Sequence, residues 1–243
     1  MSITITQITE HPRKPGRFQI HLDGTRHATV GLELIVRLGL RVGRTMGEAE
    51  LAELDEGARA LATYDRALAM LAVRGRPARE LRRRLVQKGE EAVHVDAAIA
   101  RLEANGLLDD RAYAVQSSRS KLAAGVSRRR VRDELARRGV DRTLADEAVA
   151  EVAEEDAVDE RDAALTAARR KVATLGRTEP LARRRRLYAF LARRGFAADD
   201  IRAAMEIALR DVDGVDGVDG VDGVEASDDA LDLDGDTASG AET

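Results

Sequence analysis

Apolar residues recur at steps of three and four positions through residues 58–210, which is the spacing of one buried face on an α-helix. The first such run holds Leu61, Tyr64, Leu68 and Leu71. The residues around them are mostly Ala, Leu, Arg and Glu, all of which favour helices. The pattern therefore predicts that this region is helical throughout.

The first 45 residues follow a different pattern, in which apolar and polar residues alternate. The run from 17 to 22 alternates and ends at Asp23-Gly24. This dipeptide favours the tight turn of a hairpin, because both turn positions take a positive φ. We expect a small β-hairpin or three-stranded meander here, followed by a short helix around residues 47–54.

A motif recurs three times in the helical region and ends each time at a glycine: Gly89, Gly139 and Gly195. In each copy an apolar residue is followed four positions later by Leu, and a basic residue precedes the Gly. Apolar positions at plus six, ten and thirteen after the Gly form one helix stripe. The Gly suits a helix end, where a left-handed residue is favoured. We therefore predict three three-helix repeats, over 58–106, 107–153 and 154–210.

Repeats of this size cannot bury their apolar faces alone and usually stack into an elongated array. The predicted fold is thus mainly all-α: three tandem three-helix repeats in an elongated array, with a small N-terminal β-hairpin and short helix within residues 1–57. Between the first two repeats, Asp109-Asp110 follows Gly106. We expect this pair to cap the next helix, because Asp is a preferred helix N-cap residue.

Charge is distributed unevenly along the chain. Residues 211–243 contain twelve Asp or Glu and no Lys or Arg, and they include repeats of Val-Asp-Gly. Such a segment cannot bury enough apolar surface to become ordered, so we predict a disordered acidic C-terminal tail. The other 210 residues are rich in Arg and carry all 40 basic groups. The formal net charge of −4 hides this division.

The basic residues recur by repeat position. Arg79, Arg129 and Arg185 each lie ten residues before a motif Gly. One interpretation is a basic stripe that faces a polyanion or an acidic protein groove. The other is a solvated surface that pairs with neighbouring Asp and Glu. The predicted stripe consists of Arg79, Arg82, Arg83, Lys88, Arg128, Arg129, Arg132, Arg137, Arg138, Arg185, Arg193 and Arg194.

A resemblance is carried by the first repeat and its junction with the second. The residues are Arg79–Leu81, Leu85, the pair Lys88-Gly89, Leu102 and the run from Gly106 to Ala114. Together with the Arg-Arg-Gly ends of the second and third repeats, they resemble the signature of the RecX family, bacterial regulators of RecA. The resemblance covers about residues 60–208. It implies three tandem three-helix units with no catalytic residues, acting in homologous recombination, DNA repair and the SOS response. It also implies a modulator, chiefly an inhibitor, that lies in the groove of the RecA–DNA filament and limits ATP hydrolysis, strand exchange and coprotease activity.

The sequence contains no recognisable set of catalytic residues. No pair of the four His has metal-ligand spacing, there is no Cys, and no Gly-rich phosphate loop occurs. We therefore expect no enzyme, no metal and no cofactor. The resemblance implies that the protein partner is the RecA filament, and we expect weak binding to single- and double-stranded DNA. Because aromatic residues are only 2% of the chain, recognition of single strands by base stacking is disfavoured.

Two alternatives to a RecA regulator stay open. A general DNA-binding or architectural protein would act without RecA, with an affinity that falls steeply with salt. A helical-repeat adaptor would use its charges only for solvation. With no apolar run of about 20 residues and no signal-peptide pattern, we expect no membrane contact and a cytoplasmic location. Nothing in the sequence demands a dimer, so we expect a monomer. The acidic tail adds a further hypothesis, that it competes with DNA for the basic stripe.

Overall fold

The computed structural model describes residues 3–176 and 178–213. The prediction of a disordered tail concerns residues 214–243, which lie outside the described residues. The start of the predicted tail is helical, since the last helix continues to Asp213. Within that helix, Asp211 pairs with Arg169, at 2.9 Å between the carboxylate and the guanidinium.

The predicted hairpin is part of a four-stranded antiparallel sheet with the order β3-β2-β1-β4. Asp23 and Gly24 form the turn between β2 and β3 with φ of 46° and 83°, as the Asp-Gly pair predicts. A short helix, α1, follows β3, and the two-residue β4 then pairs with the start of β1. The bounds are β1 (Ile3–Glu10), β2 (Arg17–Leu22), β3 (Thr25–Gly31), α1 (Leu32–Leu38) and β4 (Thr45–Met46).

The prediction of a separate short helix around residues 47–54 is wrong, because α2 (Glu48–Val73) is one continuous helix of 26 residues. Leu54 in its first half is buried in the core of the sheet, whereas Tyr64 in its second half belongs to the core of the first repeat. Gly57 does not end the helix. It lets α1 approach closely, since a Cβ at Gly57 would lie 2.5 Å from Cδ2 of Leu34.

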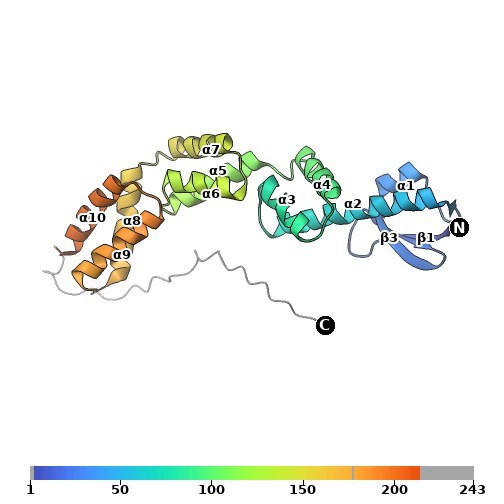
Figure 1. Ribbon diagram of the computed structural model, residues 1–243, viewed down its shortest axis with the longest axis horizontal. Helices are drawn as coiled ribbons and strands as arrows, with labels where there is room; N and C mark the ends of the chain where they lie inside the picture. Colours follow the sequence, from blue (N-terminus) through green and yellow to red (C-terminus); the bar gives the residue numbers. More distant parts are fainter. Residues whose placement is uncertain (1–2, 177, 214–243) are drawn as a thin grey trace.

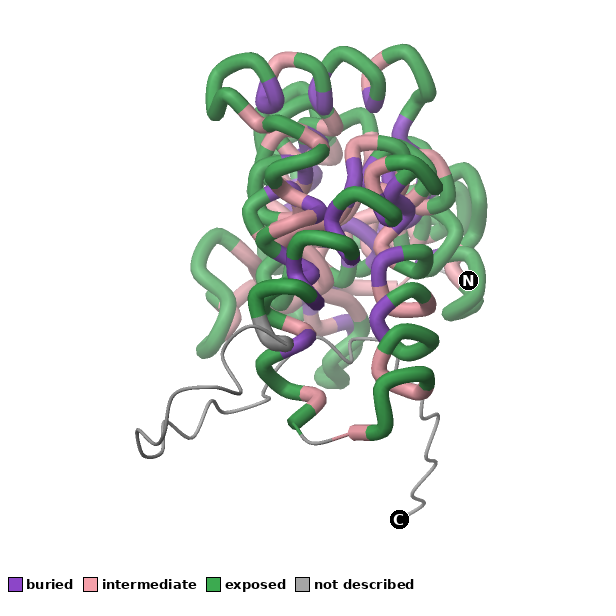
Figure 2. The backbone as a smooth tube through the Cα atoms, turned by 90° about the vertical axis from the view of Figure 1, so that its left-hand side faces the viewer, coloured by how far each residue is buried: buried purple, intermediate pink, exposed green. Residues whose placement is uncertain are grey.

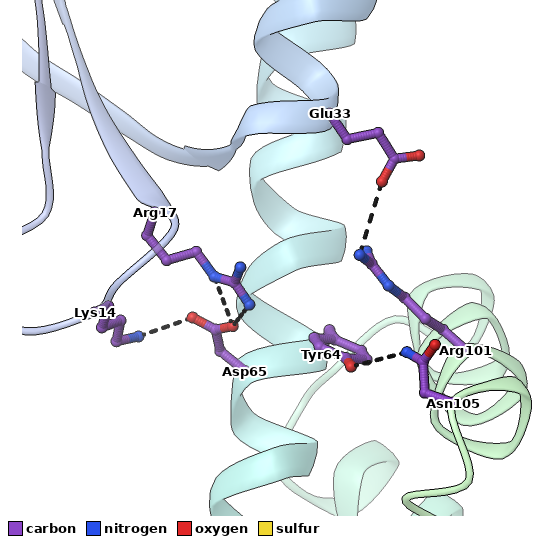
Figure 3. A network of polar contacts seen from close by, with 7 residues as sticks. All are labelled: Lys14, Arg17, Glu33, Tyr64, Asp65, Arg101 and Asn105. Atoms are coloured by element: carbon purple, nitrogen blue, oxygen red, sulfur yellow. Dashed lines mark hydrogen bonds and ion pairs between the residues drawn. The ribbon is translucent and has the colours of Figure 1, made fainter.

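Polar contacts hold the sheet to the first repeat on both sides of α2 (Figure 3). Asp65 of α2 accepts hydrogen bonds from Arg17 of β2 at 2.7 Å and from Lys14 at 3.1 Å. On the other side, Arg101 of the first repeat lies 3.7 Å from Glu33 of α1. Helix α2 therefore joins the sheet to the repeats (Figure 1).

Three-helix units follow one another along the longest axis of the molecule, so the predicted elongated array of three repeats is confirmed (Figure 1). Each unit has its own hydrophobic core. We propose that the repeat boundaries lie in the loops between α4 and α5 and between α7 and α8. The first unit consists of the end of α2, α3 (Ala78–Gln87) and α4 (Ala92–Ala104); the second of α5 (Asp110–Ala123), α6 (Arg128–Arg138) and α7 (Arg142–Glu155); the third of α8 (Glu160–Leu175), α9 (Pro180–Arg193) and α10 (Ala198–Asp213).

Buried positions lie on the faces that the helices turn toward each other, and the outward faces are exposed (Figure 2). The repeated motif accounts for the most buried part of each unit. Its apolar residue and its Leu are at most 1% exposed in all three copies: Leu81 and Leu85, Val131 and Leu135, and Leu187 and Leu191. The motif glycines have φ between 85° and 99°, the left-handed conformation predicted for a helix end.

Candidate functional site: a basic cleft between the repeats

The middle helices of the three units, α3, α6 and α9, meet end to start. Gly139 at the end of α6 lies against Arg79 at the start of α3, where a Cβ on Gly139 would come 2.7 Å from that of Arg79. Gly195 at the end of α9 lies equally close to Arg130, near the start of α6. The N–H of Ser127 donates to the carbonyl of Arg194 at 3.0 Å. Glycine at these two helix ends therefore permits the close contact between units.

A second contact, a hydrogen bond from a helix start to an acidic side chain, also recurs between the units. The Asp110 carboxylate at the start of α5 accepts a hydrogen bond from the N–H of Ala78, the first residue of α3, at 2.8 Å. Glu160 at the start of α8 does the same for Arg128, the first residue of α6, at 2.6 Å. Asp109 caps α5 itself, as predicted. An acidic residue thus satisfies the free N–H at the start of the preceding middle helix.

Where the three units meet, an open cleft of about 530 Å³ is lined mainly by basic side chains. We call it the basic cleft. Its walls come from the segment after α2, from α3, from α5 and α6, and from the end of α9. A cleft with one sign of charge concentrates the electrostatic field and attracts anionic partners. Its nine basic residues are Arg74, Arg83, Arg84, Lys121, Arg130, Arg137, Arg138, Arg193 and Arg194.

Glu80 is a buried acid beside the basic cleft, only 3% exposed. Its Oε1 accepts hydrogen bonds from Arg76 at 2.6 Å and from Arg74 and Arg84 at 3.1 Å each. Burial acts to raise the pKa of Glu80, but the hydrogen bonds from Arg76 and Arg74 outweigh it and hold the pKa below its ordinary value. One ionised carboxylate thus positions two of the arginines that line the cleft.

Glu134 on α6 has the same role in the second repeat. It accepts a hydrogen bond from Arg130 at 3.0 Å and pairs with Lys121. Burial acts to raise the pKa of Glu134, and the contacts with Lys121 and then Arg130 lower it below the ordinary value. The two acids fix four of the nine cations, and the cleft keeps a large excess of positive charge.

Five of the twelve residues predicted for the stripe have side-chain partners outside their own helix. Arg194 donates to the carbonyl of Gly125 at 3.0 Å, and its guanidinium lies 4.5 Å from the centre of the Phe190 ring. Arg128 donates to the carbonyl of Val158 between the second and third units. These contacts join units rather than face solvent. The other three are Arg82, paired with Asp96 at 2.6 Å; Arg132, 3.5 Å from Asp146; and Arg138, which donates to the Tyr113 hydroxyl at 3.0 Å.

The other seven predicted residues are exposed and form no ion pair within residues 3–176 and 178–213. Arg83, Arg137 and Arg193 come from the three middle helices, and all line the basic cleft. Arg79 lies with Arg132 and Arg137 in a neighbouring cleft of about 910 Å³ over α6 and α7. Three of the seven line neither cleft: Lys88, Arg129 and Arg185.

Sequence reasoning missed four residues that line the basic cleft, together with the buried Glu80. Two of the four lie at the ends of the arginine runs 82–84 and 128–130, so the runs themselves were a usable signal. Glu80 was marked by its position four residues after Arg76 and four before Arg84, the spacing of neighbours on one helix face. The four missed cleft residues are Arg74, Arg84, Lys121 and Arg130.

Within the described ranges 3–176 and 178–213, no group of three His, Asp or Glu side chains is arranged to hold a metal ion. No helix in that part of the chain is long and apolar enough to cross a membrane.

The fold and the cleft define a class: an elongated protein of three-helix repeats with a basic cleft where the repeats meet. Models of the first, second and third three-helix domains of RecX match residues 64–102, 109–149 and 159–205, about half of the chain. The order of the three domains is the order of the three repeats. The chain belongs to the RecX family.

Individual relatives agree with this assignment. "Regulatory protein RecX" of Levilactobacillus brevis is 27% identical over 123 residues, which are 51% of this chain and 46% of the relative. The protein of the same name from Bacillus velezensis is 27% identical over 110 residues, 45% of this chain and 42% of the relative. The match thus spans less than half the length of either relative. A crystal structure of a regulatory protein RecX has the same fold, with a TM-score of 0.64 at 20% identity over 84% of this chain and 99% of that chain.

Proposed function

We propose that this chain regulates RecA by binding along the RecA–DNA filament, without chemistry of its own. In this proposal it acts in the cytoplasm as a monomer. It lies in the filament groove and chiefly inhibits, limiting ATP hydrolysis, strand exchange and coprotease activity. The observation that carries the proposal is the basic cleft, where Arg83, Arg137 and Arg193 gather from three successive repeats without acidic partners among the described residues.

The shape and charge of the molecule support this proposal. An elongated array whose units repeat is suited to a partner that is itself long and repetitive. Unpaired cations on such an array attract acidic protein surfaces and phosphates over about a Debye length, roughly 8 Å at physiological salt. Membership of the RecX family supports RecA as the protein partner.

The test is the ATPase activity of RecA on single-stranded DNA, with this protein added in substoichiometric amounts. We expect inhibition well below one copy per RecA. The variant Arg83→Glu/Arg137→Glu/Arg193→Glu should lose this inhibition, because it reverses the charge at three walls of the basic cleft.

A matched control changes the same charge on exposed arginines remote from the repeats, in Arg13→Glu/Arg26→Glu/Arg41→Glu. This variant should inhibit like the unmodified chain. Inhibition that sets in only when the protein coats the DNA would instead favour a general DNA-binding protein. No inhibition at any ratio would refute regulation of RecA.

A further inference from the structure

The basic cleft has a candidate occupant within the same chain. We propose that the acidic C-terminal segment, residues 214–243, docks in the basic cleft and competes there with the anionic partner. The inference rests on the proposed function only in taking this cleft as the partner's binding surface. The contact itself requires neither RecA nor DNA.

Charge complementarity is the first argument. Residues 214–243 contain ten Asp or Glu and no Lys or Arg. The cleft presents nine basic side chains and two acids. Both acids are already held by arginine or lysine, so the remaining cations have no acidic partner among the described residues. The acidic segment could supply the missing negative charge.

The spacing of the acids also fits an open cleft. In the Val-Asp-Gly repeats the carboxylates recur every third residue, which is about 10 Å along an extended chain at about 3.3 Å per residue. An extended segment with Gly at every third position has little steric bulk and low conformational barriers. It could therefore follow the cations of successive repeats without a folded interface.

The segment starts close enough to reach the cleft. Helix α10, which ends at Asp213, packs on α9 in the third repeat (Figure 1). Arg193 and Arg194 at the end of α9 line the cleft. Helix α10 starts at Ala198, four residues after Arg194, and its 16 residues make it about 24 Å long, so the segment begins about that far from the cleft. The segment has 30 residues, a length for which a linker spans about 30 Å on average, so attachment to α10 gives it a high effective concentration at the cleft.

An acid near the end of α10, just before this segment, already has a basic partner. Asp211, the first acid after the last basic residue of the chain, pairs with Arg169 of α8 at 2.9 Å. The end of α10 thus carries an acid that pairs with a basic side chain of the third repeat, outside the basic cleft.

Docking of this segment has a consequence for binding. A nucleic acid that enters the cleft has to displace the segment, so the intact chain binds DNA more weakly than a chain without it. Salt weakens the intramolecular contact and the DNA contact together. The affinity of the intact chain for DNA should therefore fall less steeply with salt than the affinity of the truncated chain.

The first experiment compares the DNA affinity of three chains, measured by the fluorescence anisotropy of a labelled 30-nucleotide oligo(dT). They are the full chain, a chain that ends at Asp213, and a full-length chain in which all ten acids of 214–243 become Asn or Gln. We expect the second and third to bind about tenfold more tightly than the first at low salt, with the difference lost at high salt. The neutralised chain keeps the length of the segment, so it separates charge from steric exclusion. Equal affinity of all three chains would overturn the competition.

The second experiment measures the contact directly. A labelled peptide of residues 214–243 is titrated with the chain that ends at Asp213, in the absence of RecA and DNA. We expect binding that salt abolishes and that Arg83→Glu/Arg137→Glu/Arg193→Glu removes, whereas Arg13→Glu/Arg26→Glu/Arg41→Glu leaves it unchanged. Absence of binding, or binding unaffected by the first variant, would overturn docking in the cleft.

The two proposals fail separately. If the peptide binds but the chain has no effect on RecA ATPase activity, the proposed function is wrong and the intramolecular contact stands. If the chain inhibits RecA but the peptide does not bind, the reverse holds.

Discussion

Gly139 at the end of α6 lies directly against Arg79 at the start of α3, at a distance where a Cβ would come 2.7 Å from the Cβ of Arg79. The contact joins the first and second repeats through their middle helices. Position 139 therefore requires glycine for two reasons: the backbone is left-handed, with φ of 99°, and the contact with Arg79 leaves no room for a side chain.

The first prediction separates these two requirements. Gly89 has φ of 86° but no atom within 4 Å of the Cβ position, so Gly89→Ala should cost only the left-handed backbone, about 1–2 kcal/mol. Gly139→Ala should cost a further 1–3 kcal/mol or so, because the added methyl group overpacks the joint. Urea unfolding of both variants measures the difference. Equal losses would contradict close packing of the repeats at Gly139.

The second prediction concerns the buried acid. Glu80→Gln should destabilise the protein by about 3–5 kcal/mol, because it leaves Arg76 and its neighbours around a neutral side chain in a buried position. Glu53→Gln is the control, since Glu53 pairs with Arg37 on the surface and should cost less than about 1 kcal/mol. Thermal unfolding of the two variants makes the comparison. A Glu80→Gln protein as stable as the control would refute the role given to this carboxylate.

The third prediction follows from the lowered pKa of Glu80. A carboxyl group with a lower pKa in the folded protein stabilises it fully above the pKa of the unfolded chain, near 4.5. That stabilisation is lost as the pH falls through the lower, folded pKa. Between neutral pH and the acid range, the unmodified chain should therefore lose more stability than Glu80→Gln. Parallel stability curves for the two proteins over this range would contradict the lowered pKa.

The fourth prediction tests the acidic caps between units. Asp110→Ala should cost about 1 kcal/mol, because it removes the acceptor for the N–H of Ala78 at the start of α3. Glu160→Ala should have an effect of the same size through Arg128. Hydrogen exchange at Ala78 in the first variant and at Arg128 in the second locates each effect. Exchange that is unchanged at both amides would show that the caps contribute nothing.

The fifth prediction contrasts two neighbouring arginines. Arg194→Ala should destabilise the joint between the second and third units by about 1–3 kcal/mol, because its guanidinium donates to the carbonyl of Gly125 and stacks on Phe190. Arg193→Ala should change stability by less than about 0.5 kcal/mol, since its side chain is exposed and makes no ion pair with a described residue. The order should reverse for DNA affinity, so that Arg193→Ala weakens DNA binding more than Arg194→Ala does. Equal stability of the two variants would contradict the structural role of Arg194.

The sequence predicts the repeats well because their signal is local. The spacing of Leu81 and Leu85 in the motif, and of their counterparts, marks the buried face of each middle helix, and the motif Gly marks its end. The continuity of α2 could not be predicted in the same way. Glycine lowers the helix propensity of the local sequence. The close contact between Gly57 and Leu34 of α1, which explains this glycine, exists only in the folded structure.

The site was predictable only in part. Equivalent positions in the motif suggested that Arg79, Arg129 and Arg185 share one surface, but the middle helices meet end to start. This arrangement gathers residues from different motif positions, such as Arg83 and Arg193, in one cleft. Burial of Glu80 likewise depends on how the units pack, which no local pattern contains.

Co-sedimentation tests most directly whether the basic cleft contacts the filament. It measures the binding of this chain to RecA filaments preassembled on single-stranded DNA with a non-hydrolysable ATP analogue. We predict that the unmodified chain and Arg13→Glu/Arg26→Glu/Arg41→Glu bind alike, and that Arg83→Glu/Arg137→Glu/Arg193→Glu binds at least about tenfold more weakly. Equal binding of the cleft variant and the unmodified chain would contradict the claim that the basic cleft is the surface that contacts the filament.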